Sequence, residues 1–466
     1  MMRRLKALSR NKVSVKRCSS LCLLCHNPFS LVVDLSSLNS ASLRAETRRL
    51  SPGVKISQLI NFLPAESPLA FVRDGSGIIG FGETLRLTAS GPDRMSQLAA
   101  AWRETVSASQ VENELAWPGS GLVAFGSVAF ADDSAADSIL IVPSLVLGSH
   151  DGEVWLTEIH LDGQSGGESV EQNGGANWFE VFADHTGEPH EFSADLHSGQ
   201  ISAERFLLNV EAALAELAEG ALQKVVLARD AVAELPASFD IRNVLRQLGE
   251  SYPTCWIYSV DGTFGASPEL LVRVSHGQVS ARVLAGTAGR GTDPGIDQAI
   301  SEALVGSAKN LAEHEFAVTS LVEALEPFCS QVDADTSPFS LALPNLWHLA
   351  SDVHGVLKTG SSALDLAAAL HPTAAVAGTP RKLALDFIAR TEGIDRGRYA
   401  APVGWISANG DGEWAIALRG GQLSESAGSG KTLRAFAGCG VVAGSSPAAE
   451  LAETHLKFAP IRGALG

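Results

Sequence analysis

The stretch from Lys431 to Lys457 reads KTLRAFAGCGVVAGSSPAAELAETHLK, and its pattern changes halfway along. Its first residues alternate between apolar and polar side chains, as a strand does. After Pro447 the spacing becomes helical, and Glu450, Glu453 and Lys457 fall on one face of the expected helix. A strand followed by a helix at the end of the chain predicts mixed α and β structure.

Similar patterns recur upstream of this stretch. Apolar residues at helical spacing predict helices over residues 202–218, 241–248 and 300–325, and a shorter one near 95–104. Between them lie short apolar segments bounded by Gly, Pro, Asp or Ser, which favours antiparallel pairing over regular βαβ alternation. The predicted fold class is α+β, with large antiparallel sheets flanked by helices. We expect strands at 70–72, 77–87, 122–129, 139–147, 224–231, 255–260, 269–274, 346–356, 412–418, 420–424 and 431–437.

Composition divides the chain into three parts. Residues 1–50 hold ten Lys or Arg and two acidic residues. We expect this basic tail to lie outside the fold, as a disordered segment, a targeting sequence or the result of a start codon placed too far upstream. Residues 55–195 and 200–466 are expected to be the two halves of one large fold, joined by an exposed Gly- and Ser-rich loop at 163–177. The site is expected in a cleft between these halves.

Charge and composition exclude several classes of protein. The formal net charge is −17, and the body after residue 50 therefore carries −25, which argues against a nucleic-acid partner. No run of about 18 apolar residues is present, so we expect no membrane span. The six cysteines form no disulfide framework, and three of them are in the tail. We expect a cytoplasmic protein, or an organellar one if the tail is a transit peptide.

Two residues of the second half have the chemistry of a proton-transfer pair. Lys224 opens the apolar segment KVVLARD. A lysine there either extends to solvent from the strand end or is buried in its neutral form as a general base. Glu269 lies between Pro268 and a Leu-Leu-Val run, and is either an edge carboxylate or a general acid whose pKa is raised by burial. The residues alone leave both alternatives open.

Two of the expected helices carry carboxylates at helical spacing. Lys309 and Glu313 are four residues apart on one helix, and Glu450 and Glu453 share a face of the last one. If these helices meet across a cleft, their carboxylates form an oxygen-ligand site for a hard cation such as Mg²⁺; otherwise they are solvated faces. The nearby string GSGKT at 428–432 lacks the first glycine of a P-loop and precedes a strand, so we interpret it as a hairpin turn.

Eight sequence blocks occur in an order that resembles the chorismate-utilising enzymes, and among them the isochorismate synthases. The resemblance is strong from about residue 202 to 465 and weaker back to about residue 61. It implies the fold of that family and an isomerase that converts chorismate to isochorismate for menaquinone or siderophore synthesis. The blocks are KVVLAR (224–229), GASPELLV (265–272), VLAGTAGRG (283–291), KNLAEH (309–314), HPTAAVAGTP (371–380), DRGRYAAPVGW (395–405), GEWAIALR (412–419) and AGCGVVAGSSPAAELAET (437–454).

A few positions distinguish the reactions within this family. Relatives that add nitrogen to the ring typically have glutamine where this chain has Lys224, and one type has a lysine nucleophile where it has Ala285. Both differences imply water as the nucleophile. Salicylate synthases share the lysine and remain the closest alternative, although the HPTAAVAG block opened by His371 resembles the isochorismate synthases. A catalytically silent chorismate-binding protein is the alternative from another class.

The resemblance also implies a role for each site residue. Lys224 would deprotonate a water aimed at ring carbon 2, and Glu269 would protonate the hydroxyl that leaves carbon 4. Mg²⁺ would hold the ring carboxylate, while further cations and hydrogen-bond donors would bind the pyruvyl carboxylate and the ring. The implied metal ligands are Glu313, Glu453 and, through water, Glu450; the implied substrate-binding residues are Gly286, Thr287, His371, Tyr399, Arg419, Gly440 and Lys457.

The resemblance bears on partners too. Hydroxyl transfer needs no supply of ammonia, so no amidotransferase subunit is implied beside the small-molecule substrate, and we expect a monomer. Two positions depart from the family pattern: Asn310 stands where many relatives have an acidic residue, and Cys439 where alanine is usual. The first departure puts in doubt a carboxylate that would support the metal ligands.

Overall fold

The structure, a computed structural model, describes residues 31–34, 42–50, 60, 63–64, 67–162, 192–343, 346–425 and 430–466. Two large sheets and the helices that cover them make up this part of the chain, which confirms the predicted α+β class with antiparallel sheets. The tail cysteines at 18, 22 and 25, the predicted loop at 163–177, Gly428 and Ser429 of the GSGKT string and the side chain of Lys309 lie outside the described residues.

The first sheet takes its eleven strands from both halves of the chain. Its order is β1-β5-β8-β7-β21-β22-β15-β16-β19-β17, with β18 paired to β19, and only β1 and β5 pair in parallel. The strands are β1 Leu31–Asp34, β5 Leu85–Ala89, β7 Val123–Ser127, β8 Ser138–Val142, β15 Leu270–Ser275, β16 Gln278–Gly289, β17 Cys329–Ala334, β18 Phe339–Ala342, β19 Leu346–Leu357, β21 Pro402–Ser407 and β22 Gly412–Ile416.

The second sheet has thirteen strands and is also built from both halves. Its order is β11-β12-β24-β23-β14-β13-β3-β4-β9-β10-β2-β6, with β20 paired to β12, and only β2 and β6 pair in parallel. The strands are β2 Leu43–Leu50, β3 Leu69–Arg73, β4 Ser76–Phe81, β6 Gln110–Glu112, β9 Leu145–His150, β10 Glu153–Leu161, β11 His197–Ser198, β12 Lys224–Leu235, β13 Trp256–Val260, β14 Thr263–Ser267, β20 Gly378–Thr379, β23 Gly420–Glu425 and β24 Lys431–Val442.

The largest hydrophobic core lies between the two sheets. Trp155 and Trp256 of the second sheet and Phe125 and Trp414 of the first belong to one cluster of buried side chains. Strands β7 and β13, which carry Phe125 and Trp256, are buried along their whole length, so both of their faces are covered. The two sheets are therefore held as one unit by apolar burial.

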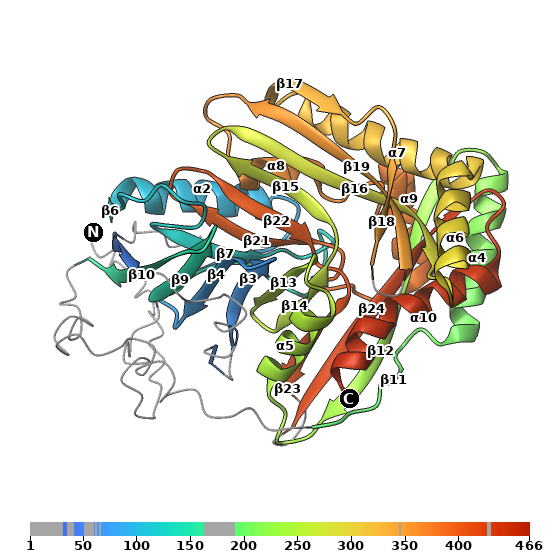
Figure 1. Cartoon of the computed structure of the whole chain (residues 1–466), viewed down its shortest axis with the longest axis horizontal. Coiled ribbons are helices and arrows are strands. Elements are labelled where there is room, and N and C mark those ends of the chain that lie inside the picture. The colour runs from blue at the N-terminus through green and yellow to red at the C-terminus, as the bar shows by residue number, and fades with distance from the viewer. Residues whose placement is uncertain are drawn as a thin grey trace, which may run out of the picture.

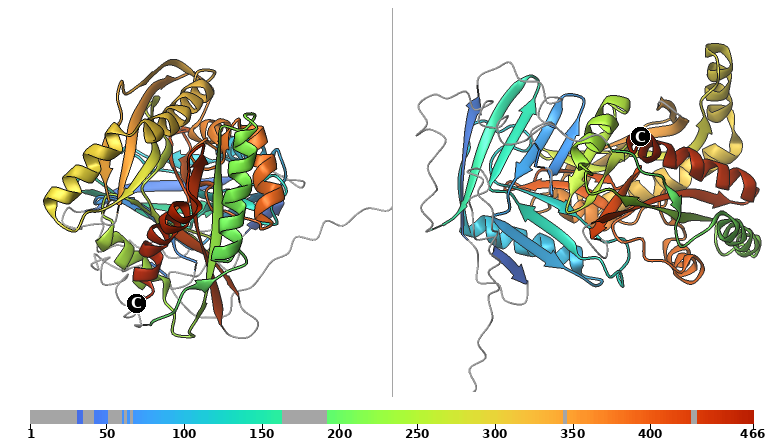
Figure 2. Two further views of the ribbon diagram at one scale, coloured as in Figure 1. Left: turned by 90° about the vertical axis from the view of Figure 1, so that its right-hand side faces the viewer. Right: turned by 90° about the horizontal axis from the view of Figure 1, so that it is seen from below.

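Eight helices cover the sheets in the described part of the chain (Figure 1). Contacts place α2, α7 and α8 against the first sheet, and α4, α5, α9 and α10 against the second. Figure 2 shows α4, α9 and α10 side by side at one end of the molecule. None of these helices has the length and hydropathy needed to span a bilayer. Their bounds are α2 Arg94–Ala108, α4 Ala203–Ala218, α5 Ile241–Ser251, α6 Pro294–Gly306, α7 Ala308–Leu325, α8 Ala363–Leu370, α9 Arg381–Glu392 and α10 Pro447–Ala464.

The single helix predicted over 300–325 is wrong, because the chain forms two helices there. Ser307 has an extended backbone, with φ −78° and ψ 113°, and so ends α6. Its hydroxyl accepts a hydrogen bond from the Asn310 backbone N–H and caps the start of α7. The cap sets the direction in which α7 leaves, and α7 carries Glu313.

Two predicted strands, 77–87 and 139–147, also prove to be two strands each. In both cases the first member and the second belong to different sheets, with the break at Gly82 in one and at Pro143 in the other. Gly82 has φ +67°, a conformation that favours glycine, and Pro143 cannot donate to a strand ladder. The stretch 139–147 is apolar on both sides of Pro143 and Ser144, and the stretch 77–87 is interrupted only by Gly82, Glu83 and Thr84, so neither pattern reveals that the chain changes sheets.

The prediction that residues 1–50 lie outside the fold is wrong for two segments, residues 31–34, which form β1 and pair with β5, and residues 43–50. Residues 43–50 form β2, which pairs along its whole length with β10. Leu43 and Ala45 are fully buried in the main core. The basic residues of this segment occupy the exposed positions, and Arg48 and Arg49 pair with Glu158 and Glu153 of β10. Their positive charge marks a solvated strand face here.

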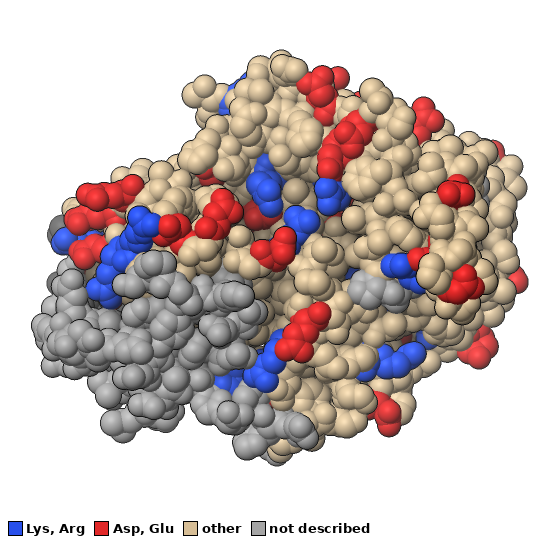
Figure 3. Space-filling view, in the orientation of Figure 1, with Lys and Arg blue, Asp and Glu red and all other residues tan. Residues whose placement is uncertain are grey.

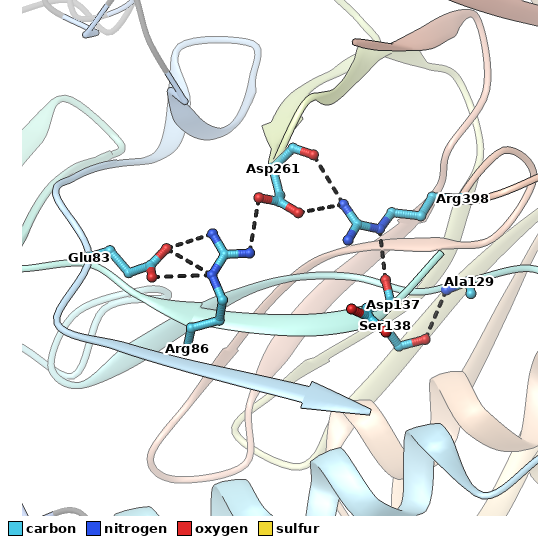
Figure 4. Close-up of polar contacts among 7 residues, drawn as sticks. All are labelled: Glu83, Arg86, Ala129, Asp137, Ser138, Asp261 and Arg398. Atoms are coloured by element: carbon cyan, nitrogen blue, oxygen red, sulfur yellow. Dashed lines mark hydrogen bonds and ion pairs between the residues drawn. The ribbon is translucent and has the colours of Figure 1, made fainter. Parts of the chain in front are cut away.

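Asp261, in the turn between β13 and β14, connects the two sheets (Figure 4). Its carboxylate accepts hydrogen bonds from Arg86 of β5 at 3.0 Å and from Arg398 at 2.9 Å. Arg86 is also paired with Glu83, and Arg398 donates to the Asp137 carbonyl beside β8. The segment that leads into β21 is thus fixed to both sheets.

Replacing Asp261 by alanine is expected to lower the free energy of unfolding at pH 7 by about 2 kcal/mol. Removing one partner of a fully buried ion pair costs roughly 3–5 kcal/mol. We expect a smaller loss here because the Asp261 side chain is 29% exposed. Burial raises the pKa of Asp261, but Arg398 and Arg86 outweigh it and leave the pKa below its usual value. A depressed pKa contributes stability above the unfolded pKa and loses it as the pH falls through the folded one.

Urea unfolding of both proteins at pH 7 and pH 3 checks this prediction. The difference in the free energy of unfolding between the wild-type protein and Asp261→Ala should have its full size at pH 7. It should be smaller at pH 3, which is below the pKa of about 4 that an aspartate has in the unfolded chain. Glu46→Ala is the control, since Glu46 pairs with Arg44 in an exposed ion pair whose loss costs less than about 1 kcal/mol. A difference for Asp261→Ala that is equal at both pH values would contradict the ion-pair explanation.

Candidate active site

A pocket lies where the long strands β12, β16 and β24 meet α7 and α10. Two of its side chains stand where the chain passes from one sheet to the other: Glu269 between β14 and β15, and Arg419 between β22 and β23. Such crossings bring residues from distant parts of the sequence to one place. The lining residues used below are Val226, Glu269, Ala285, Gly286, Thr287, Glu313, His348, Arg396, Tyr399, Arg419, Cys439, Gly440, Glu453 and Lys457.

The expectation of a cleft between residues 55–195 and 200–466 is wrong. Every residue that lines the pocket falls between 226 and 457, in the second half. Both halves contribute strands to both sheets, so the boundary between them in sequence forms no cleft in space. The first half serves the site from a distance, by extending the sheets and the core.

Lys224 is the first residue of β12 and is 1% exposed, which excludes the alternative of a lysine extended to solvent. Its Nζ lies 3.1 Å from Glu313 Oε1, on α7. Gly440 lies opposite Val226 in the β12–β24 pair. A Cβ at Gly440 would stand 2.6 Å from Glu313 Oε1 and 3.0 Å from Lys224 Cε. The absence of a side chain at Gly440 therefore makes room for the Lys224–Glu313 pair.

Glu269 is buried in the crossing between the sheets and is 5% exposed. Burial raises its pKa to about 7, although Arg419, Lys224 and Lys457 all favour the ionised form. At neutral pH a large fraction of this carboxyl is protonated. The alternative of an ordinary edge carboxylate is excluded, and Glu269 has the charge state that a general acid needs.

Arg419 takes part in a hydrogen-bonded chain that ends at Thr287. Arg419 Nη2 lies 3.0 Å from His348 Nε2, and Thr287 Oγ1 lies 3.1 Å from His348 Nδ1. Burial lowers the pKa of His348 well below its usual value, and Arg419 and Lys457 lower it further. His348 is therefore neutral, and because arginine can only donate, the imidazole accepts at Nε2 and carries its proton on Nδ1.

Lys457 and Tyr399 complete the cationic side of the pocket. Lys457 Nζ donates to the Gly438 carbonyl at 2.8 Å and pairs with Glu453 at 2.6 Å. The Tyr399 ring stacks on Phe436 at 5.0 Å between centroids, which fixes the phenol in the pocket. On the face drawn in Figure 3, Lys and Arg side chains gather near the centre next to acidic ones, while most of the remaining surface is uncharged.

Gly286 and Thr287 are on an irregular part of β16. The register of β16 against β19 shifts between Leu284 and Thr287, and Gly286 has φ +92°. His314 of α7 holds this bulge, since its Nδ1 lies 3.1 Å from the Ala285 carbonyl. Asn310 packs beside it: a Cβ at Gly286 would lie 3.2 Å from Asn310 Cβ. The bulge brings backbone to the pocket wall, as the resemblance implies.

The implied metal ligands do not all reach the pocket. Glu313 and Glu453 line it from α7 and α10, but Glu450 does not, and it is buried nearby. Burial first, then Glu453 and Glu450, raise the pKa of the Cys439 thiol well above its usual value. Within the described residues, no three His, Cys, Asp or Glu side chains are grouped to hold a metal. Two carboxylates are nonetheless a donor set that suits Mg²⁺, which keeps several waters.

His371 does not line this pocket, contrary to the implied substrate contact. Its Nε2 lies 3.0 Å from the Phe130 carbonyl, and burial lowers its pKa to about 3. It faces a different and larger cavity of about 1000 Å³, formed with Arg94 and Arg381 among others. A neutral, hydrogen-bonded histidine at the end of α8 has a structural role, which the motif could not distinguish from binding.

Four residues that the sequence analysis did not single out support the site. His348 and His314 are described above. Arg396 and Glu392 form an ion pair whose side chains are at most 2% exposed. Arg396 donates to the Val226 carbonyl and Glu392 accepts from the Ala228 N–H, so the pair fixes β12 just beyond Lys224. Arg396 and His314 do fall inside quoted blocks, DRGRYAAPVGW and KNLAEH, which is the only signal that could have found them.

Comparison with known proteins shows the family to which the chain belongs. The model of a family described as chorismate binding enzyme matches residues 60–466. A Mycobacterium tuberculosis protein provisionally named isochorismate synthase MenF is 43% identical over 260 residues, 53% of this chain and 69% of that protein. Isochorismate synthase DhbC of Bacillus subtilis is 39% identical over 269 residues, 55% of this chain and 66% of that protein.

The solved structure of MenF, the menaquinone-specific isochorismate synthase of Escherichia coli, superposes with a TM-score of 0.71. The match covers 93% of this chain and 97% of that one at 24% identity, and it therefore bears on the fold alone. Over nearly the whole of both chains the two sheets and their helices are alike.

Proposed function

This chain belongs to the chorismate binding enzymes, and we propose that it is an isochorismate synthase, an isomerase that moves a hydroxyl group on the ring of chorismate. The observation that carries the proposal is a buried amine, Lys224, which pairs with the pocket-lining Glu313, and a buried acid, Glu269, which lines the same pocket as Arg419 and Lys457. Its product would serve menaquinone or siderophore synthesis.

Substrate capture is assigned to the cationic side of the pocket. Chorismate is a dianion and the chain has a net charge of −17, so local cations must bind it. The planar guanidinium of Arg419, oriented by His348, suits the pyruvyl carboxylate, and Lys457 supplies a second charge. The Tyr399 hydroxyl and the Gly440 N–H would add two donors.

The reaction needs a base on one side of the ring and an acid on the other. Lys224, as a free amine, would take a proton from a water that attacks ring carbon 2. Glu269, protonated, would give its proton to the hydroxyl that leaves carbon 4 as water, while the double bonds shift between the two carbons. Water is consumed and released once each, so the product is an isomer of chorismate. The ion pair between Lys224 and Glu313 has to open before Lys224 can act.

Glu313 and Glu453 are the residues that would hold Mg²⁺, with Glu450 behind them. When bound, the metal would neutralise the ring carboxylate and orient the ring. Without the metal, these two carboxylates pair with the lysines of the site, Glu313 with Lys224 at 3.1 Å and Glu453 with Lys457 at 2.6 Å.

Several features support water over ammonia as the nucleophile. Lys224 stands where nitrogen-adding relatives typically have glutamine, and Ala285 lines the pocket without a nucleophile of its own. An enzyme that uses water needs no amidotransferase partner, and we propose that the chain acts by itself, as a monomer. The salicylate-forming alternative shares Lys224, and the names of the curated relatives favour it less.

The proposed function is tested by incubating the purified protein with chorismate and Mg²⁺ and separating the products by chromatography and mass. The expected product has the mass of chorismate and gains one heavy oxygen when the reaction runs in ¹⁸O-labelled water. Removal of divalent cations with EDTA should abolish the reaction, and added Mg²⁺ should restore it. A product lighter by pyruvate would mean salicylate formation. A reaction that requires ammonia would contradict the choice of nucleophile.

Gly440→Ala is expected to lower turnover by about 10²-fold, the effect of misplacing reacting groups by about 1 Å. The added Cβ would meet Glu313 Oε1 at 2.6 Å and Lys224 Cε at 3.0 Å, so this pair must move. Gly463→Ala on α10 is the matched control, because its Cβ meets nothing within 4 Å. Steady-state rates and thermal unfolding of both variants check this prediction. Normal turnover in Gly440→Ala would contradict the tight packing of Lys224 and Glu313 against Gly440.

A further inference from the structure

The hydroxyl of Thr373 is buried without a partner behind the active site. Thr373 lies in the segment between α8 and β20 and is 8% exposed. Its Oγ1 makes no hydrogen bond to any described residue. A buried hydroxyl without a partner is unfavourable, because it has lost its hydrogen bonds to water. Within the part of the chain that the structure describes, no group is placed to hydrogen-bond this hydroxyl.

Thr373 lines a small cavity that Glu269 also lines. The cavity has about 10 Å³ of free volume, close to the minimum that one water molecule requires. Arg282, the one other charged residue among its lining, is engaged by Asp352 at 2.6 Å and 2.7 Å. Thr373 and Glu269 thus remain as the polar side chains open to a ligand. The other walls are Leu270, Leu271, Val283, Ala317, Leu321, Ala375 and Ile416.

Glu269 lines both this cavity and the active-site pocket, and so stands between them. The charged groups that act on it are Arg419 and Lys457 of the pocket and the buried Lys224, and the Leu284 backbone N–H also donates to it. No described side chain donates to the carboxyl from the cavity side. That side is where a water held by Thr373 would stand.

We propose that one water occupies this cavity and connects the Thr373 hydroxyl to the Glu269 carboxyl, which makes Thr373 a positioning residue for the general acid. The hydroxyl donates to the water, and the water donates to the inner carboxyl oxygen. The proton of Glu269 then resides on the outer oxygen, which faces the substrate. After that proton leaves with the departing hydroxyl, the same water stabilises the carboxylate. The catalytic part of this inference rests on the proposed function; the water site does not.

Thr373→Val, which keeps the shape and removes the hydroxyl, tests the proposal. We expect kcat to fall by about 10- to 100-fold with little change in KM. The alkaline limb of the pH profile should move to higher pH, because a donor to the ionised carboxyl is lost. Thr373→Ser keeps the hydroxyl and should restore most of the rate and the position of the limb. A purely structural role would lower the rate without moving the limb.

A high-resolution crystal structure of the wild-type protein provides the second measurement. Density for one water between Thr373 and Glu269, absent in Thr373→Val, is expected. A dry cavity, or a Thr373→Val variant with the wild-type rate and pH profile, would overturn the proposal. If the protein fails to convert chorismate while the water is present, the proposed function fails and the water site stands. The two failures are therefore distinguishable.

Discussion

Lys224→Ala is expected to lower the turnover of chorismate by about 10³- to 10⁴-fold. General-base assistance contributes roughly 10²- to 10⁴-fold, and the substitution also leaves the Glu313 carboxylate without its partner in a buried place. The rate of product formation at saturating chorismate measures the effect. Circular dichroism establishes that the variant has folded. Lys382→Ala, which removes an exposed lysine paired with Asp386, is the control and should keep the wild-type rate.

Lys224→Arg separates proton transfer from charge. Arginine can keep the ion pair with Glu313, but it stays protonated in proteins and cannot accept a proton from water. If Lys224 is the base, this variant is as inactive as Lys224→Ala. A Lys224→Arg variant with more than about a tenth of the wild-type rate would show that the site needs a positive charge and that the base is another group.

The sequence predicted the residues at the centre of the site better than those around it. Lys224, Glu269 and Lys457 each stand in an apolar or periodic setting that can be noticed in one sequence, whereas Arg419 was implied by the family resemblance alone. His348 sits within a strand of the first sheet and has no such setting. Its role depends on a contact with Arg419, which is 71 positions away in the sequence and comes close only in the folded chain.

The sequence predicted the α+β class of the fold, but it did not predict which strands belong to which sheet. Local apolar patterns identified about half of the described strands and missed others, such as β10, β16 and β21. They could not show that β4 and β5, or β8 and β9, lie in different sheets. The sheet that a strand joins depends on pairing with strands far away in the sequence. The partner of β2, for example, is β10, which begins more than 100 residues later. His371 failed for a related reason: its partner, the Phe130 carbonyl, is 241 positions away.

Glu269→Gln is expected to lower turnover by about 10²- to 10⁴-fold, because the amide has the shape of the acid but no proton to give. In the wild-type protein, burial raises the pKa of Glu269 to about 7. Since the protonated form donates, kcat/KM should fall as the pH rises above about 7. The residual activity of the variant should lack this limb. A variant that keeps the limb would assign it to another group.

Although Glu269→Gln is expected to be less active, we expect it to be more stable than the wild-type protein at high pH. A group whose folded pKa is raised above its unfolded value favours the folded state below the unfolded pKa, and this contribution is lost as the pH rises through the folded pKa. For Glu269 the window runs from about 4.5 to about 7. Over it the wild-type protein should lose about 3 kcal/mol, at 1.36 kcal/mol for each pKa unit.

Because glutamine does not ionise, Glu269→Gln should match the wild-type protein at pH 5 in urea unfolding and exceed it at pH 9. An inactive variant that is also more stable at high pH would mean that burial of the Glu269 carboxyl lowers the stability of the wild-type protein. An inactive variant without that gain would mean that Glu269 reaches solvent, and a solvated carboxyl would be ionised at neutral pH and unable to protonate a leaving hydroxyl.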